Sequence, residues 1–326
     1  MHRRSLIRLL GLATMASVGV PLPGWTAGTP QPVSRGWRAS QLRDHPLVGH
    51  IWDAGLQRFV PQGTLIGALT RASFALLGEV HDNPDHHAVQ AELLGAIAAR
   101  NADRAVVFEQ FDREYEPVLQ RAMAKGDVDA EAVATAVNLD RKGWNWAFYK
   151  PLVDIALRHG MGMHAGNLSR ASGAQIARQG MAVLEPVRIA ALRLDSGWSD
   201  AREQALREII ALGHCGALPE SAIPAMAAAQ RARDATLAEA LLAVTRDGAV
   251  LIAGNGHVRR DIGVPVYLSS AAPRRPSCAL GILEVDAAAL EPQAYLQSAT
   301  PDARRYDFVF FTPRWERPDP CEAFSR

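Results

Sequence analysis

The sequence has few cysteines, no charge excess and no long apolar run beyond its first residues. Its three cysteines, Cys215, Cys278 and Cys321, include no C-x-x-C spacing, which argues against a thiolate zinc site and a dense disulfide framework. One disulfide would suit an oxidising compartment. With 35 Lys and Arg against 34 Asp and Glu, no broad field favours nucleic acid as a partner. A chain of 326 residues, 48% of them hydrophobic, can form one large α/β domain with an insertion or two modest domains.

The first 27 residues have the pattern of an export signal. Arg3 and Arg4 precede an apolar stretch, Leu9 to Val20, that is too short to span a bilayer comfortably. The paired arginines followed by Ser5 are similar to a twin-arginine signal, and no cysteine nearby could accept a lipid. We therefore expect a signal peptide over residues 1–27 and a periplasmic protein. Residues 28–45, rich in Gly, Pro, Ser and Arg, predict a flexible N-terminal extension outside the core.

A βαβ pattern begins at Phe74. An apolar run ends at Glu79, a helix is predicted from about Pro84, and a strand is predicted over Ala105 to Phe108. Later helices are expected over 117–124, 131–137 and 146–158, with Gly160 as a helix-terminating residue. Further strands are expected at 161–165, 249–253, 264–268, 280–285 and 308–311.

Residues 169–246 have no strand pattern and instead predict Ala- and Leu-rich amphipathic helices. The sequence therefore predicts an α/β fold, with a mostly parallel β-sheet flanked by helices. The sheet domain would comprise residues 46–168 and 247–326, and residues 169–246 would form a helical insertion subdomain.

Polar side chains follow the ends of several predicted strands. In an open α/β sheet, ligands bind beyond the carboxyl ends of the strands, so these residues should converge on one polar site. They are Glu79, His81, Glu109, Asn167 and His257.

Two of these positions belong to a repeated G-x-x-H pattern, at Gly78 to His81 and Gly254 to His257. The two histidines with Glu109 could ligate a divalent metal, with an open position at which water is activated. The alternative is a buried network in which the glutamates cap helices or pair with arginines and only stabilise the fold. The residues alone leave both interpretations open.

Four segments occur in order along the chain: GEVHDNPDHH at 78–87, FEQFDR at 108–113, NLSR at 167–170 and IAGNGHVR at 252–259. Together with QRARDATLA at 230–238, they resemble the ChaN family of haem-binding, iron-uptake-associated proteins. The resemblance covers roughly Phe74 to Leu268. It implies a parallel-sheet domain with a helical subdomain, and haem bound between two protomers.

The resemblance also implies a wider superfamily that contains TraB, PrgY, the erythromycin esterases and the Tiki metalloproteases. Those relatives share the paired G-x-x-H and an intervening Glu, which map here to His81, His257 and Glu109. ChaN-like proteins are often lipoproteins, and the missing lipobox cysteine is a departure from that pattern. It favours a soluble carrier over surface attachment.

A haem site needs an axial iron donor and groups that bind the propionates. The aromatic segment at 144–150 is the predicted site: Trp146 offers flat apolar surface, Tyr149 an axial phenolate of the kind the resemblance implies, and Lys150 a propionate partner. At helical spacing the same aromatics would equally suit a core. His86 and His87, at a helix start where a neutral ring can accept from free amides, could reach a propionate or be ordinary surface residues.

Two functions of different classes follow. The first is a periplasmic haem-binding protein for haem or iron acquisition or trafficking, possibly a homodimer that shares haem and works with an outer-membrane transport system. The second is a hydrolase in which His81, Glu109 and His257 hold a divalent metal such as Mn, Co or Zn and Glu79 is the general base. A third interpretation makes the polar cluster purely structural.

Overall fold

An eight-stranded, mostly parallel sheet forms the centre of the molecule. The computed structural model describes residues 29–244, 247–300, 303–319 and 321–322, so the expected signal peptide lies outside the described residues. The strand order is β2-β1-β8-β7-β3-β6-β4-β5. The strands from β8 to β5 are parallel, and β1 and β2 extend the sheet in antiparallel fashion. The strands are β1 (Ile51–Asp53), β2 (Arg58–Phe59), β3 (Phe74–Leu77), β4 (Ala105–Asp112), β5 (Met163–Asn167), β6 (Ala249–Ile252), β7 (Ser277–Glu284) and β8 (Phe308–Thr312).

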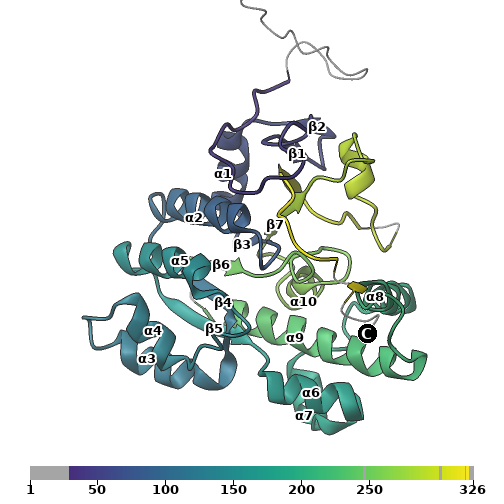
Figure 1. Cartoon of the computed structure of the whole chain (residues 1–326). Coiled ribbons are helices and arrows are strands. Elements are labelled where there is room, and N and C mark those ends of the chain that lie inside the picture. The colour runs from purple at the N-terminus through teal and green to yellow at the C-terminus, as the bar shows by residue number, and fades with distance from the viewer. Residues whose placement is uncertain (1–28, 245–246, 301–302, 320, 323–326) are drawn as a thin grey trace, which may run out of the picture.

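Helices cover both faces of this sheet (Figure 1). Alternate strand residues serve opposite faces: Ala75 and Leu77 join one apolar core, and Phe74 and Leu76 join the other. Because both faces are covered, the central strands are continuously apolar. The first core includes α1 (Gln62–Arg71), α2 (Pro84–Ala98), α3 (Glu116–Met123), α4 (Ala130–Ala136) and α5 (Trp146–Arg158), and the second includes α9 (Ile223–Ala243) and α10 (Val264–Ala271).

The βαβ unit and its helix signals are confirmed. The Asn83 side chain caps α2 by accepting from the amide of Asp85, and Pro84 occupies the first turn. Gly160 has a φ of +68° just beyond α5, where a left-handed residue ends a helix. The α/β fold class predicted from the sequence is therefore correct.

The predicted strand at 264–268 is wrong, because these residues form most of α10. A short apolar run does not distinguish a buried strand from a buried helix. Pro265 lies in the first turn, where proline favours a helix start. The short strands β1 and β2 were not predicted, since two or three residues carry no periodic signal.

Between β5 and β6 the described residues contain helices and no strand, as the sequence predicted. They are α6 (Arg170–Gln179), α7 (Pro186–Ala191), α8 (Asp200–Gly213) and α9. The 21-residue helix α9 packs on β4, β5 and α10 and also on α6 and α8. The helix α9 therefore contacts both the sheet and the other helices of the segment between β5 and β6. No described helix is long and apolar enough to cross a membrane.

The N-terminal extension packs against the body of the protein. The carboxylate of Asp85 accepts from the amides of Arg38 and Ala39 at 2.8–3.1 Å, and Ala39 is fully buried. The expectation that residues 28–45 lie outside the core is thus wrong for Ala39. The extension has no helix, and a single isolated bridge joins Gln41 to Arg314.

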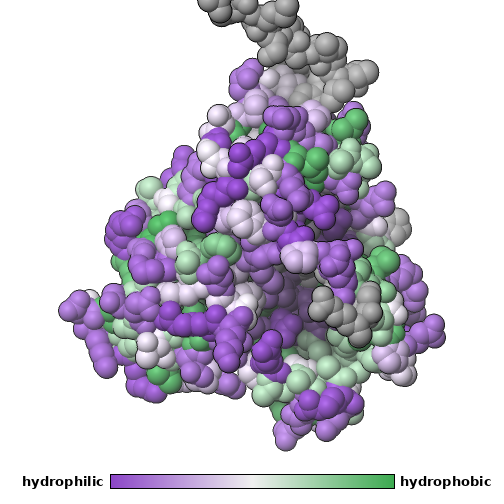
Figure 2. Space-filling view, viewed as in Figure 1, coloured by the Kyte–Doolittle hydropathy of each residue, from purple (hydrophilic) through white to green (hydrophobic). Residues whose placement is uncertain are grey.

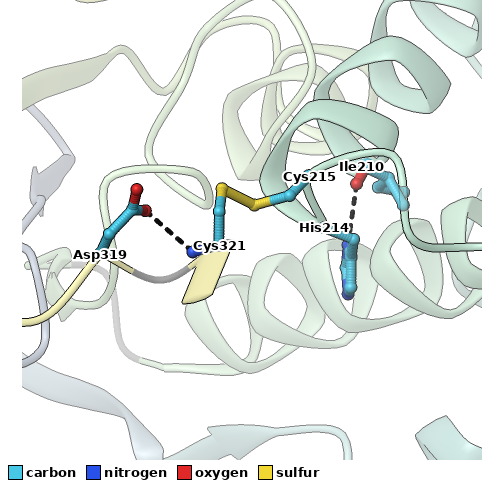
Figure 3. Close-up of a disulfide and its surroundings, with 5 residues drawn as sticks. All are labelled: Ile210, His214, Cys215, Asp319 and Cys321. Atoms are coloured by element: carbon cyan, nitrogen blue, oxygen red, sulfur yellow. Dashed lines mark hydrogen bonds between the residues drawn. A yellow bond between two sulfur atoms is a disulfide. The ribbon is translucent and has the colours of Figure 1, made fainter. Parts of the chain in front are cut away.

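A disulfide joins Cys215, just beyond α8, to Cys321 in the C-terminal segment (Figure 3). The same segment is held elsewhere by Arg317, which donates to Asp82 and Glu284 at 2.7 Å. The bridge therefore fixes the end of α8 to a segment that is itself attached to the sheet. Cys278, the free cysteine, is buried.

Replacing Cys321 by Ser should lower the free energy of unfolding by about 2–4 kcal/mol, because the bridge spans 106 residues of sequence. Urea unfolding of the oxidised protein measures this. Cys215→Ser is the matched control and should cost a similar amount, with no further loss in the double variant. Fully additive losses would contradict the bridge.

Candidate functional site

A buried imidazole between two carboxylates lies at the carboxyl edge of the sheet. His257, in the loop after β6, places Nε2 3.1 Å from Glu109 Oε1 on β4 and Nδ1 2.6 Å from Asp234 Oδ1 on α9. The other oxygen of Glu109 accepts from the amide of Gly254 at 2.7 Å. All three side chains are at most 8% exposed. Two ionised carboxylates can only accept, so this geometry favours a proton on each ring nitrogen of His257, as in an imidazolium.

The electrostatics agree with this protonation state. Burial disfavours a charged ring, but Glu109 and Asp234 more than offset it and raise the pKa of His257 to about 10. Burial also opposes ionisation of Glu109, and the charge of His257 overcomes it and holds the pKa of that carboxyl well below its ordinary value. For Asp234 burial prevails and raises the pKa.

A second pair lies beside the first. Glu79, directly after β3, accepts from Nδ1 of His81 at 2.5 Å and from the Tyr149 hydroxyl at 3.2 Å. Burial disfavours the charged ring, yet Glu79 and then Glu109 raise the pKa of His81 to about 9. The side chain of His81 is 49% exposed, so this pair connects the buried network to the surface, where Trp144 packs edge-on against the ring.

In each G-x-x-H motif, the first glycine lies against a side chain of the other motif. A Cβ on Gly254 would lie 2.8 Å from Cε1 of His81, and a Cβ on Gly78 would overlap Oδ1 of Asn255. Each motif therefore leaves the space that a side chain of the other motif occupies. The convergence predicted from the sequence is correct for Glu79, His81, Glu109 and His257. Asn167 ends β5 and is buried, and no described hydrogen bond links it to this network.

The expected metal ligands do not form a metal site in this geometry. Among the residues that the structure describes, no group of three His, Cys, Asp or Glu side chains is placed to hold a metal ion. Nε2 of His257 and Nδ1 of His81 donate to Glu109 and Glu79 respectively. Glu109 and His257 form one hydrogen-bonded pair, and His81 forms another with Glu79.

The residues expected to contact haem are placed in the core or on an outer helix face. Tyr149 is fully buried, and burial together with Glu79 raises the pKa of its hydroxyl well above the ordinary value, which disfavours a phenolate. Trp146 is mostly buried and donates to Glu131, and Lys150 pairs with Asp154 at 2.8 Å.

The two histidines of α2 are also buried. His86 accepts from the amide of Val80 and contacts Thr312, and burial lowers its pKa well below the ordinary value. His87 donates to the carbonyl of His81 and stacks on Phe148. The alternative that they are ordinary surface residues is wrong, because both side chains are buried. His86 is, however, a neutral ring that accepts from an amide, as the sequence suggested.

A cavity of about 760 Å³ lies next to the network. Three helices each present one face to it at spacings of three and four residues: α6 with 170, 173, 174 and 177, α8 with 206, 209, 210 and 213, and α9 with 226, 229, 230, 233 and 234. Asn255, Gly256, Leu283 and Tyr306 close it from the sheet side. Figure 2 shows this face of the molecule hollowed beside the helical part, with apolar side chains along its rim. Tyr149, Trp146, Lys150, His86 and His87 do not line this cavity.

The cavity combines an apolar wall with four arginines. Arg259 is committed to a bidentate pair with Asp261. Arg233 and Arg305 each have a buried Nε atom without a hydrogen-bond partner in the protein. Arg170 is 88% exposed at the rim, 3.5 Å from Asp140. These arginines were not predicted, and neither was the role of Asp234, although it lies within the segment at 230–238. The residues of α8 and α9 that line the cavity recur at helical spacing in the sequence, and this spacing was the signal that could have indicated the wall.

A family model described as "Haem-binding uptake, Tiki superfamily, ChaN" matches residues 65–268. Among solved structures, one titled "Cofacial heme binding to ChaN of Campylobacter jejuni" is 21% identical, with 80% of this chain and 95% of that chain covered and a TM-score of 0.64. It shows the same fold. An erythromycin esterase EreC mutant in its open conformation (14% identity, 68% and 73% covered) and the type III effector HopBA1 (13%, 77% and 92%) have TM-scores of 0.38. No curated protein matches the chain.

The raised pKa of His257 predicts a pH-dependent stability. Because the folded state holds this proton more tightly than the unfolded chain, the contribution is complete below about pH 6.5 and is lost as pH rises toward 10. The free energy of unfolding should therefore fall by up to about 1.4 kcal/mol per pH unit in this window. Urea unfolding from pH 6.5 to 9.5 measures the slope. In His257→Gln the slope should decrease by up to about 1.4 kcal/mol per pH unit and keep the part that His81 contributes, whereas His159→Gln should keep the full slope. An unchanged slope in His257→Gln would disprove the charged pair.

The surroundings of Gly78 and Gly254 predict different losses of stability when each glycine is replaced by Ala. Gly78→Ala should destabilise by about 1–3 kcal/mol, because the methyl meets Val258 at 2.7 Å and the backbone carbonyl of Leu280 at 2.9 Å. Gly254→Ala should cost less, since the half-exposed His81 ring can move aside. Thermal unfolding of both variants measures the difference, and equal losses would argue against this packing.

Proposed function

Because the chain belongs to the haem-binding uptake family of the Tiki superfamily, ChaN, we propose that it binds haem in the cavity between α6, α8, α9 and the carboxyl edge of the sheet. The observation that carries the proposal is the composition of this cavity, in which apolar helix faces and arginines enclose about 760 Å³. Sites for small ligands and cofactors are of this size and are mostly apolar with a few polar groups.

The residues present fit the chemical parts of haem. The macrocycle is flat and apolar, and Leu206, Ile209 and Ile210 offer an apolar wall on α8. The propionates need cations, and arginine binds carboxylates in a bidentate manner. Arg233 is suited to this role, because its Nε is buried without a partner. Its Nη2 lies beside Gly173, one turn from Arg170 on α6.

A periplasmic role in haem or iron acquisition is the second part of the proposal. The first 27 residues have an export pattern, and the Cys215–Cys321 disulfide suits an oxidising compartment. A cavity that opens at the surface also suits a homodimer in which two protomers share haem, in line with the cofacial haem named for the Campylobacter jejuni structure. Such a carrier would exchange haem with an outer-membrane transport system.

The metal-dependent hydrolase is the weaker candidate. The described residues offer no group of three ligands for a metal, and His257 uses both ring nitrogens in hydrogen bonds to carboxylates. Oε1 of Glu79 is engaged by His81 and Tyr149, and its Oε2 is buried without a hydrogen-bond partner in the protein.

A haem titration followed by absorption spectroscopy tests the proposed site. The wild type should give a saturable Soret change at micromolar haem. The double variant Arg170→Gln, Arg233→Gln should bind about tenfold or more weakly, because it loses charge-assisted hydrogen bonds to the propionates. Arg178→Gln, an exposed position on α6 that does not line the cavity, is the matched control.

Tyr149→Phe separates this site from the aromatic segment at 144–150. Since Tyr149 is buried and bonded to Glu79, the variant should keep the wild-type Soret band and affinity. If Tyr149→Phe lost haem while the arginine variant bound it normally, the haem site would be the aromatic segment at 144–150 and not the cavity. The absence of saturable binding by the wild type would reject the proposed function.

A further inference from the structure

A second cavity, of about 540 Å³, is lined mainly by basic and hydroxyl side chains. Of the eight described residues that line it, three are arginines, two are serines and none is acidic. We call this cavity the arginine pocket, after Arg202, Arg260 and Arg304. A cleft lined by charge of one sign focuses the electrostatic field and raises the local concentration of ions of the opposite sign.

The arginine pocket is separate from the proposed haem cavity, although the same two segments contribute to both. The amide of Arg260 donates to the carbonyl of Arg305 at 2.9 Å, so the loop after β6 lies against the segment that leads into β8. Arg259 and Arg305 line the haem cavity, whereas Arg260 and Arg304 line the arginine pocket. The two cavities have no lining residue in common. A ligand of the arginine pocket would therefore be held by groups that haem binding does not use.

The positive charge of the arginine pocket is only partly neutralised. Arg260 pairs with Asp307 at 2.8 Å. Arg202 donates from Nε to the backbone carbonyl of Asp261 at 2.9 Å, which is a neutral acceptor. Arg304 is exposed, and no ion pair or hydrogen bond joins it to the part of the chain that the structure describes. Three arginines and one paired carboxylate leave this group with a formal charge of +2.

Two serines in the last turn of α10 add hydroxyl groups to the arginine pocket. Ser269 is exposed, and Ser270 is half-buried with its hydroxyl against that of Ser196. The C-terminal end of a helix carries partial negative charge, so α10 itself does not attract an anion. The attraction comes from the arginines, and the hydroxyls supply further donors. These donors reach the pocket from α8, α10, the loop after β6 and the segment before β8.

We propose that the arginine pocket binds a phosphate group. A phosphate monoester presents three strong acceptor oxygens and a charge of about −1.5 to −2 at pH 7, which suits donors that arrive from four segments. A carboxylate presents two oxygens in one plane and a single charge. The cavity has the size of small-ligand sites, so it has room for part of the molecule that carries the phosphate. A free phosphate compound and a lipid headgroup share this chemistry. The proposal is independent of haem binding.

Calorimetric titration with inorganic phosphate, pyrophosphate and acetate at constant ionic strength tests the arginine pocket. The wild type should bind the phosphates saturably and acetate about tenfold or more weakly. The double variant Arg202→Gln, Arg304→Gln should bind phosphate about tenfold or more weakly, because it loses two charged donors. The double variant Arg178→Gln, Arg274→Gln is the charge-matched control and should bind as the wild type does, since both positions are exposed and line neither cavity.

Arg304→Gln alone keeps the test decisive if the double variant does not fold, because Arg304 is exposed. This single variant should bind phosphate about fivefold more weakly. Sedimentation with vesicles of phosphatidic acid, against vesicles of phosphatidylcholine, identifies the source of the phosphate. Binding to phosphatidic acid that the double variant loses would assign a lipid headgroup, and binding of soluble phosphates alone would assign a free phosphate compound.

The two proposals fail separately. Haem affinity should be unchanged in Arg202→Gln, Arg304→Gln, and phosphate affinity should be unchanged in Arg170→Gln, Arg233→Gln. A wild type that binds phosphate neither in solution nor on vesicles would overturn the assignment of the arginine pocket. Equal phosphate affinity in the wild type and in Arg202→Gln, Arg304→Gln would also overturn it, as would an equal loss in the charge-matched control or acetate binding as tight as that of phosphate.

Discussion

The contact on which this structure most depends is the imidazolium of His257 between Glu109 and Asp234. It joins a strand, a loop and the longest helix, so it ties the helical part of the chain to the edge of the sheet. Removing one partner would leave a buried charge without compensation, which typically costs about 3–5 kcal/mol. The position of α9, and with it one wall of the cavity, follows from this contact.

The network around His257 is not isolated from the cavity. Asp234 and Gln230 belong both to the surroundings of His257 and to the cavity lining. A ligand that displaced either side chain would act on the same hydrogen bonds that position the sheet edge.

The sequence predicted the parts of the fold that have a strong local signal. The β3-α2-β4 unit, the cap at Asn83 and the convergence of Glu79, His81, Glu109 and His257 follow from apolar runs and from the topology of parallel sheets. Residues 264–268 were misassigned because five apolar residues suit either a strand or a helix.

The cavity could not be read from the sequence, because its wall is made of apolar helix faces that look like ordinary core. Leu206, Ile209 and Ile210 have core spacing, and only the three-dimensional arrangement shows that they face a space rather than a neighbouring side chain. Conversely, the aromatic segment at 144–150 looked like a ligand platform, but two of its aromatic side chains, Trp146 and Tyr149, are buried in the core. Its aromatic rings pack against α2, where His87 contacts both Phe148 and Tyr149.

The two glycines of the G-x-x-H motifs have a consequence for how such chains can change over time. Gly78 makes room for Asn255, and Gly254 makes room for His81, so a larger first residue in either motif displaces a side chain of the other. A lineage that altered one motif would first have to reshape the other, through an intermediate that packs poorly. The two motifs should therefore be inherited or lost together.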